Sequence, residues 1–289
     1  MYRLTNEYQT LLLRGRENAE ALQAWTFANE RLGDASQGLV FDPVPHRYSI
    51  GGTVIPSVSS IVEYFDPFDT PAVAYRCSKN ERHEMYGKSV SDILEIWKAR
   101  GLEAAAAGTV VHEFGEACFL AKAGRLAEVP QAYAPRIAPD GTMEASSPKE
   151  EAVARWWNDL DLQRYVLIAK EARVYNPELL YAGTFDVLLY DLYEHHYVLK
   201  DYKTNGDIHK WYGEKLRAPL SPIKANDVGK YTVQQNLYKI ELENIGLKVG
   251  RMDLIWLRDD GSYQEISISD CGKLVAFAAR QYKERKLAA

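Results

Sequence analysis

Apolar positions in the middle of the chain alternate with polar ones or run together, in three segments separated by short turns. These segments are residues 165–176, 182–192 and 195–204. Such patterns are typical of strands buried in a sheet, and short turns join antiparallel neighbours. We therefore expect three consecutive strands that pair in chain order.

On both sides of these strands the polar and apolar positions favour helices. The segments predicted to be helical are 1–35, 58–65, 71–100, 103–124, 147–161, 228–246 and 273–286. Ser57 and Ser147 are suitable N-cap residues, and Pro148 and Glu150 give the helix after Ser147 the sequence of a capping box. Within 103–124 we expect Gly108 to allow close approach of neighbouring structure.

Two hairpins complete the pattern, one over residues 47–55 with a Gly51-Gly52 turn and one over 250–268 with Asp260-Gly261 at its turn. The order is then helices, three strands, a helix, two strands and a helix. This order predicts an α/β (α+β) fold with helices packed on a sheet. We find no internal repeat and no linker, and expect a single domain over residues 1–289.

Composition allows a sizeable core, because 46% of the 289 residues are hydrophobic. Three scattered cysteines, Cys77, Cys118 and Cys271, do not suit a disulfide framework, a zinc ribbon or a four-cysteine iron-sulfur cluster. The first residues do not resemble a signal peptide, and no apolar run approaches the roughly 18 residues of a membrane span. We expect a cytoplasmic protein without a membrane partner.

Charge gives no global indication of nucleic-acid binding, because the formal net charge is -5. Residues 195–230 differ, since they contain seven Lys or Arg residues against four acidic ones, a surplus of three. A polyanion bound near this segment and a solvated loop both account for that surplus.

Charged residues interrupt two of the predicted strands. Asp186 lies in the apolar run 182–192, and Asp201 and Lys203 are two positions apart, so that both side chains emerge on one face. Counting back from the turn near residues 193–196 places Asp186 beside Asp201. A buried carboxylate is costly unless it binds a cation or accepts hydrogen bonds. An Asp at a strand edge that bonds a turn is the structural alternative.

Two carboxylates and a lysine form a chemical set that suits Mg²⁺ or Mn²⁺ and the hydrolysis of a phosphodiester. Lys203 can hold the attacking water or stabilise a developing oxyanion. His112 offers a third ligand, and Glu116 lies one helical turn further on the same face. Taken alone, a helical His is more often a packed core or surface residue.

In chain order, these residues resemble a known family. Gly108-x-x-x-His112, Gly183-x-x-Asp186, Asp201-Tyr202-Lys203 and Gln234-x-x-x-Tyr238 are similar to the motifs of the RecB-type branch of the PD-(D/E)XK nuclease superfamily. Residues 46–69 also resemble the N-terminal segment of many phage-encoded members. The resemblance covers about residues 46 to 257.

This resemblance implies a restriction-endonuclease-like αβββαβ core, with a central mixed sheet flanked by helices and helical N-terminal additions. The implied division is a helical and hairpin extension over 1–100, the nuclease core over 101–270 and a C-terminal helix over 271–289.

The resemblance also assigns roles within the site. Asp186, Asp201 and Lys203 are the implied catalytic residues. One or two Mg²⁺ or Mn²⁺ ions would be bound by His112, Asp186, Asp201 and the backbone carbonyl of Tyr202. Supporting residues are Glu116, Glu171, Gln234 and Tyr238. Phe185 stands where many relatives have proline, and the scattered cysteines cannot supply the iron-sulfur cluster that several relatives carry.

The implied activity is a metal-dependent DNA exonuclease (a hydrolase), phage or mobile-element encoded, acting in DNA recombination, repair or genome processing. No P-loop is present, so a helicase partner would be a separate chain, and a recombination or annealing protein is another candidate partner. A structure-specific endonuclease and a non-catalytic nucleic-acid-binding or assembly module remain as alternatives. Trp211, Tyr212 and Arg217, in the loop 205–229, are candidate substrate contacts, although a lid packed on the core would use the same residues.

Overall fold

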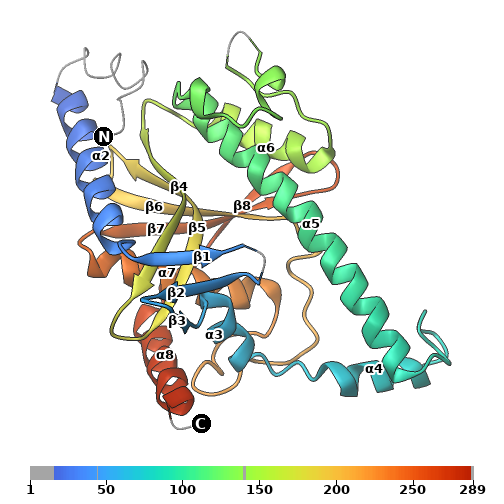
Figure 1. Ribbon diagram of the computed structural model, residues 1–289. Helices are drawn as coiled ribbons and strands as arrows, with labels where there is room; N and C mark the ends of the chain where they lie inside the picture. The colour runs from blue at the N-terminus through green and yellow to red at the C-terminus, as the bar shows by residue number, and fades with distance from the viewer. Residues whose placement is uncertain (1–15, 44, 139–140, 288–289) are drawn as a thin grey trace.

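A computed structural model describes residues 16–43, 45–138 and 141–287 of the chain (Figure 1). The helices are α2 (Arg16–Ala35), α3 (Val58–Phe65), α4 (Thr70–Lys79), α5 (Val90–Lys122), α6 (Pro148–Asp159), α7 (Asp227–Asn244) and α8 (Gly272–Leu287), with short 3-10 turns at Leu126–Glu128 and Ala134–Arg136. The strands are β1 (Leu39–Asp42), β2 (Arg47–Ile50), β3 (Thr53–Ile55), β4 (Tyr165–Asn176), β5 (Tyr181–Asp191), β6 (His196–Lys203), β7 (Val249–Leu257) and β8 (Tyr263–Ser267). The helix predicted within residues 1–15 lies outside the described residues.

The central sheet has the strand order β4-β5-β6-β7-β8. Its neighbours are antiparallel except β6 and β7, which are parallel and are connected through α7. Parallel neighbours need such a crossover, whereas short turns suffice for β4 to β6. The sheet is therefore mixed, and the order α5, β4, β5, β6, α7, β7 confirms the predicted αβββαβ fold.

Helices cover both faces of this sheet, with α5 and α6 on one face and α3, α7 and α8 on the other (Figure 1). Nearly every residue of β5 and β6 is buried, as continuous apolar strands between two helical layers require. On α6, Trp156 and Trp157 are both buried, and each large apolar side chain removed from water contributes about 2 to 3 kcal/mol. The core thus lies on both faces of β5 and β6.

A small antiparallel sheet, β1-β2-β3, packs beside the central one. Its β2–β3 hairpin was predicted, but β1 was not, because four residues next to Pro43 give too short a pattern. The Ala182 amide at the start of β5 donates to the carbonyl of Pro56, 2.9 Å away. The small sheet is thereby joined to β5 near Asp186.

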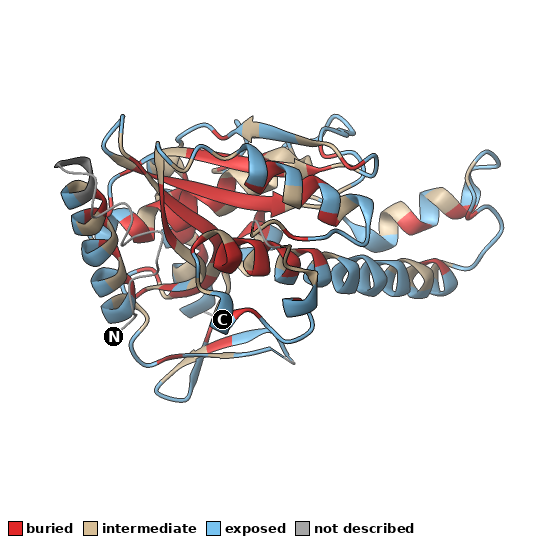
Figure 2. Ribbon diagram, turned by 90° about the horizontal axis from the view of Figure 1, so that it is seen from above, coloured by how far each residue is buried: buried red, intermediate tan, exposed pale blue. Residues whose placement is uncertain are grey.

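The helix boundary predicted near residue 101 was wrong. The break falls at residues 80–89, where the chain turns with Gly87 in the left-handed region, and one helix then runs through Gly101 to Lys122. Ser89 caps that helix by accepting from the Asp92 amide, and the alanine-rich run 104–107 favours its continuation through the glycine. Figure 2 shows the N-terminal half of α5 projecting from the sheet with an exposed surface.

No helix in the described ranges is long and apolar enough to cross a membrane.

Candidate metal centre

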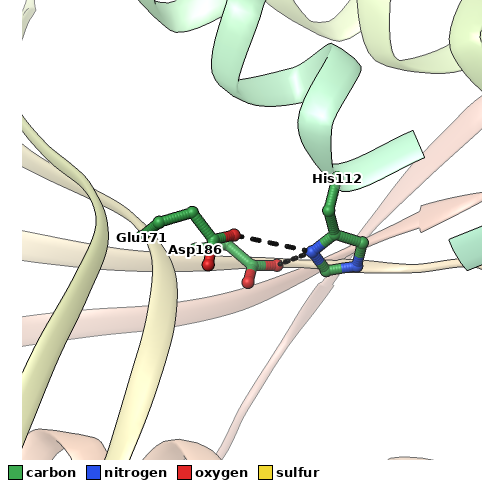
Figure 3. Close-up of side chains that lie close together, drawn as sticks. All are labelled: His112, Glu171 and Asp186. Carbon is green, nitrogen blue, oxygen red and sulfur yellow. Dashed lines mark ion pairs between the residues drawn. The ribbon is translucent and has the colours of Figure 1, made fainter. Parts of the chain in front are cut away.

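Three elements bring a histidine and two carboxylates together at one edge of the sheet (Figure 3). His112 comes from α5, Glu171 from β4 and Asp186 from β5. The His112 Nδ1 atom lies 3.3 Å from Asp186 Oδ2 and 3.7 Å from Glu171 Oε1. One ligand atom from each residue lies within 4.8 Å of the other two, so the three side chains can hold a metal ion.

Glu171 reaches this group through an irregularity in β4. Its φ of 43° places it in the left-handed region, which is unusual for a side chain other than glycine, and a bulge lies close by between Leu167 and Ala169. Regular pairing continues on both sides of Glu171, which lies opposite Asp186. The resemblance gave Glu171 a supporting role, whereas the structure places its carboxylate among the possible metal ligands.

Asp186 is fixed by the neighbouring strand. The Tyr202 amide of β6 donates to Asp186 Oδ2 at 2.7 Å, beyond the last regular pair of β5 and β6. Because the N–H and C=O of one strand residue point to the same side, the Tyr202 carbonyl faces the edge that holds the Asp186 carboxylate. This position is compatible with the coordinating role expected for that carbonyl.

The Tyr202 side chain turns the other way, into the layer of α5 and α6. A Cβ atom on Gly115 of α5 would lie 2.7 Å from the Tyr202 ring, so only glycine fits there. Close approach was expected at Gly108, but a Cβ atom there would meet Thr204 Oγ1 at 3.5 Å, an ordinary contact. Gly115 is therefore the residue that lets α5 bring His112 to the sheet.

Asp201 and Lys203 lie on the opposite face of β6 from Tyr202 and form an ion pair. Lys203 Nζ also donates to Gln234 Oε1 of α7 at 3.4 Å, and Gln234 Nε2 donates to the Tyr238 hydroxyl at 3.2 Å. Tyr238 packs against the bare backbone of Gly183, where a Cβ atom would lie 2.6 Å from its ring. The residues of all four sequence motifs thus meet around one site.

The carboxyl groups of the site are crowded, with Asp186 and Asp201 buried and Glu171 half-buried. Burial of Glu171 raises its pKa to about 7, although His112 opposes the shift. Burial and the nearby Asp186 carboxylate together raise the pKa of Asp201 to about 6. Elevated pKa values show that negative charge is costly here, and a divalent cation would offset that cost.

The pKa values of His112 and Asp186 shift in opposite directions, as expected for an imidazolium close to a carboxylate. Burial alone would lower the pKa of His112, but Asp186 and Glu171 raise it to about 10. Burial would raise the pKa of Asp186, but His112 and Lys203 hold it below its usual range. The donor set of one imidazole and several carboxylate oxygens fits a divalent ion that accepts oxygen and nitrogen ligands.

These residues open onto a cleft of about 610 Å³. Its wall includes His112, Glu116, Glu171, Asp186, Asp201, Lys203, Gln234 and Tyr238, and also Phe41, His46, Tyr48 and Arg173. Glu116 forms an ion pair with Lys170 and is not one of the three grouped ligands.

The proposed substrate contacts of the loop 205–229 lie elsewhere. Trp211, Tyr212 and Arg217 do not belong to the wall of the cleft. Arg217 instead donates to the Tyr64 carbonyl at 3.2 Å, and the Trp211 indole donates to the Glu214 carbonyl at 2.5 Å. Their role in substrate contact stays a prediction.

Sequence reasoning missed Phe41, His46 and Arg173 on the wall. Arg173 follows Glu171 by two positions in a strand, and this spacing was the one signal that placed it near the site. Phe41 and His46 reach the cleft through β1 and the turn after it, which no pattern indicated.

Neither the models of known protein families nor the curated proteins give a match to this chain. The fold and the site therefore rest on the geometry described above: a mixed five-strand sheet between helices, with a His–Glu–Asp group at its edge.

Proposed function

We propose that this protein is a divalent-metal-dependent DNA exonuclease that hydrolyses phosphodiester bonds. The observation that carries the proposal is the convergence of His112, Glu171 and Asp186 with the Asp201–Lys203 pair in one cleft. Carboxylate-rich sites with a lysine suit phosphate chemistry, because the oxygens hold a hard cation and the ammonium group offsets charge on the phosphate.

His112, Glu171 and Asp186 would hold Mg²⁺ or Mn²⁺, and Asp201 with the Tyr202 carbonyl would hold the same ion or a second one. When bound, such an ion polarises the phosphate and makes a nearby water more acidic. The preference for Mg²⁺ or Mn²⁺ follows from the majority of oxygen donors.

Lys203 would act as a cation. Burial opposes its charge, but Asp201 and Tyr231 raise the pKa of Lys203 above its ordinary value. A lysine held in its charged form is suited to orient a water and to stabilise a developing oxyanion, and not to accept a proton. Gln234 and Tyr238 would fix its position from α7.

The cleft also has features that suit the nucleic-acid backbone. The N-cap and the first turn of α3 contribute Ser57 and Ser59 to the wall, and the amides at a helix N-terminus favour a phosphate. Lys170 and Arg173 add positive charge beside the ligand group. An acidic protein can bind DNA through such a local arrangement.

The experiment is a nuclease assay on linear and circular DNA with Mg²⁺ or Mn²⁺. Asp186→Asn and Lys203→Gln are expected to lower kcat by about 10³-fold, within the range seen when a charge-stabilising group is removed. Glu103→Gln and Lys98→Gln, on the exposed half of α5, are the matched controls and should retain activity. Unchanged activity of both site variants would contradict the proposal.

The circular substrate separates the two kinds of nuclease. An exonuclease degrades only the linear DNA, whereas an endonuclease also opens the circle. If the wild-type protein binds DNA but hydrolyses neither form with any divalent ion, the chain is a binding module and the exonuclease proposal fails.

A further inference from the structure

One side of the cleft is a wall of rings and a guanidinium that take no part in the proposed metal binding or in the reaction itself. The rings of Phe41 and His46 are 4.9 Å apart at 86°, and the Phe41 and Tyr48 rings are 4.8 Å apart. The Arg173 guanidinium lies over the Phe41 ring, 5.2 Å from its centre. We call Phe41, His46 and Arg173 the aromatic wall.

The aromatic wall is held at a fixed position relative to the metal centre. The hydroxyl of Tyr48, whose ring contacts Phe41, is hydrogen-bonded to Thr184 Oγ1 at 2.9 Å. Thr184 is two residues before Asp186 in β5, so the two side chains share a face at a spacing of about 7 Å. Phe41 and His46 are thus tied to β5 through Tyr48, and Arg173 of β4 lies opposite Thr184 in the pairing of β4 and β5, so the wall adjoins the strand that carries Asp186.

The wall is accessible from the cleft. His46 and Arg173 are exposed, Phe41 is partly exposed, and all three line the cleft. Arg173 contacts the Phe41 ring, and within the described ranges it forms no ion pair with a carboxylate. A planar guanidinium supported by a ring on one side is a surface on which bases stack.

We propose that the aromatic wall binds the unpaired base of the nucleotide next to the cleaved phosphodiester, by stacking on Arg173 and His46. This inference rests on the proposed nuclease function and specifies its substrate as a single-stranded or frayed DNA end. A base within a duplex is covered by its neighbours on both faces, so it has no free face to offer. Stacking is tolerant of sequence, and the wall therefore selects unpaired structure and not a particular base.

The test combines changes in the protein with changes in the substrate. Arg173→Lys keeps the positive charge but loses the planar guanidinium group. Phe41→Ala removes the ring on which that guanidinium lies. On a single-stranded oligonucleotide both variants are expected to lower kcat/KM about 10-fold, as stacking energies predict. When the base on either side of the cleaved bond is replaced by an abasic site, the wild-type protein should lose the same factor, and the variants should lose almost nothing more.

Phe277→Ala, which removes an exposed phenyl ring on α8, is the matched control and should behave as wild type on both substrates. Two results would overturn the inference and leave the nuclease function intact. One is that Arg173→Lys lowers kcat/KM by the same factor on the intact and the abasic substrate. The other is that Arg173→Lys is fully active on both.

A separate measurement distinguishes failure of the nuclease proposal. Binding of an oligonucleotide that carries 2-aminopurine is followed by fluorescence in Ca²⁺. If quenching depends on Arg173 but no hydrolysis occurs in Mg²⁺ or Mn²⁺, the proposed base-binding site is supported and the proposed nuclease function is rejected. Absence of Arg173-dependent quenching would reject the base site whether or not the protein cuts DNA. Circular dichroism of each variant checks that it is folded.

Discussion

At the scale of single residues, Tyr231 explains how Lys203 is kept in place. Lys203 Nζ lies 4.1 Å from the centre of the Tyr231 ring, and the Tyr231 hydroxyl donates to Asn205 Oδ1 at 2.8 Å. Ammonium groups are attracted to the face of an aromatic ring, and more strongly where water is excluded. Tyr231 is therefore a positioning residue for the proposed catalytic lysine.

Tyr231→Leu is expected to lower kcat about 10-fold with little change in KM, because the displaced ammonium group would stabilise the transition state less well. Tyr231→Phe keeps the ring and should recover most of the rate. Steady-state kinetics on a DNA substrate check both. A Leu variant as active as the wild type would show that Asp201 and Gln234 suffice to place Lys203.

A second prediction concerns Glu241, a buried carboxyl on α7 that does not line the cleft. The Asn176 amide and the Tyr181 hydroxyl, the latter at 2.9 Å, donate to Glu241 Oε1. Burial nevertheless raises the pKa of Glu241 from 4.5 to about 7. The folded protein thus retains a proton that the unfolded chain loses at lower pH.

A raised pKa in the folded state stabilises the protein below pH 4.5, and this contribution is lost as the pH rises to about 7. The loss amounts to about 3 kcal/mol once both states are ionised. Glu241→Gln has no proton to lose, so its free energy of unfolding should fall less between pH 5 and pH 8. Urea denaturation at the two pH values measures the difference. If the free energy of unfolding falls by the same amount in the wild type and in Glu241→Gln, the raised pKa of Glu241 is refuted.

At the scale of elements, α5 joins two halves with different surroundings. Its C-terminal half packs on the sheet through Gly115, whereas Gly101 in the projecting half meets no atom within 4 Å of an added Cβ. The same substitution should therefore have opposite effects at the two positions.

Gly115→Ala is expected to destabilise the protein by about 1 to 3 kcal/mol, because the methyl group would displace the packed Tyr202 ring. Gly101→Ala should stabilise it by up to about 1 kcal/mol through helix propensity alone. Thermal or urea unfolding of both variants provides the comparison. Equal effects would mean that α5 does not press on Tyr202.

The elements that sequence reasoning predicted well are those with long, regular patterns. The three central strands, the helix over 228–246 and both hairpins follow from period and turn residues, and the short turn after β5 correctly placed Asp186 beside Asp201. The break before α5 and the strand β1 were not predicted, because local composition there favours helix or gives no period. The approach of Glu171 depends on one left-handed residue within a strand, which no spacing rule reveals.

At the scale of the whole molecule, the ligand group links segments that are far apart in the chain. His112, Glu171 and Asp186 come from three elements, so an unfolded chain cannot hold an ion with all of them at once. Binding of an ion to the folded state alone adds to the free energy of unfolding.

Mg²⁺ or Mn²⁺ at about 100 times its dissociation constant should raise the unfolding free energy by about 3 kcal/mol and Tm by about 4 °C. Asp186→Asn should abolish this shift, and Glu103→Gln should keep it. Differential scanning calorimetry with and without the ion measures the effect. A shift that survives in Asp186→Asn would place the ion elsewhere.

The left-handed backbone of Glu171 places the stability of the fold in conflict with the proposed function. Glycine adopts a φ of 43° without strain, and the substitution would also remove a half-buried carboxylate from a crowded site. Glu171→Gly is thus expected to raise the free energy of unfolding and, at the same time, to remove one of the three metal ligands. A laboratory selection for heat resistance alone is expected to replace Glu171 early. If Glu171 is kept when activity is also selected, the glutamate is retained for its function and not for stability.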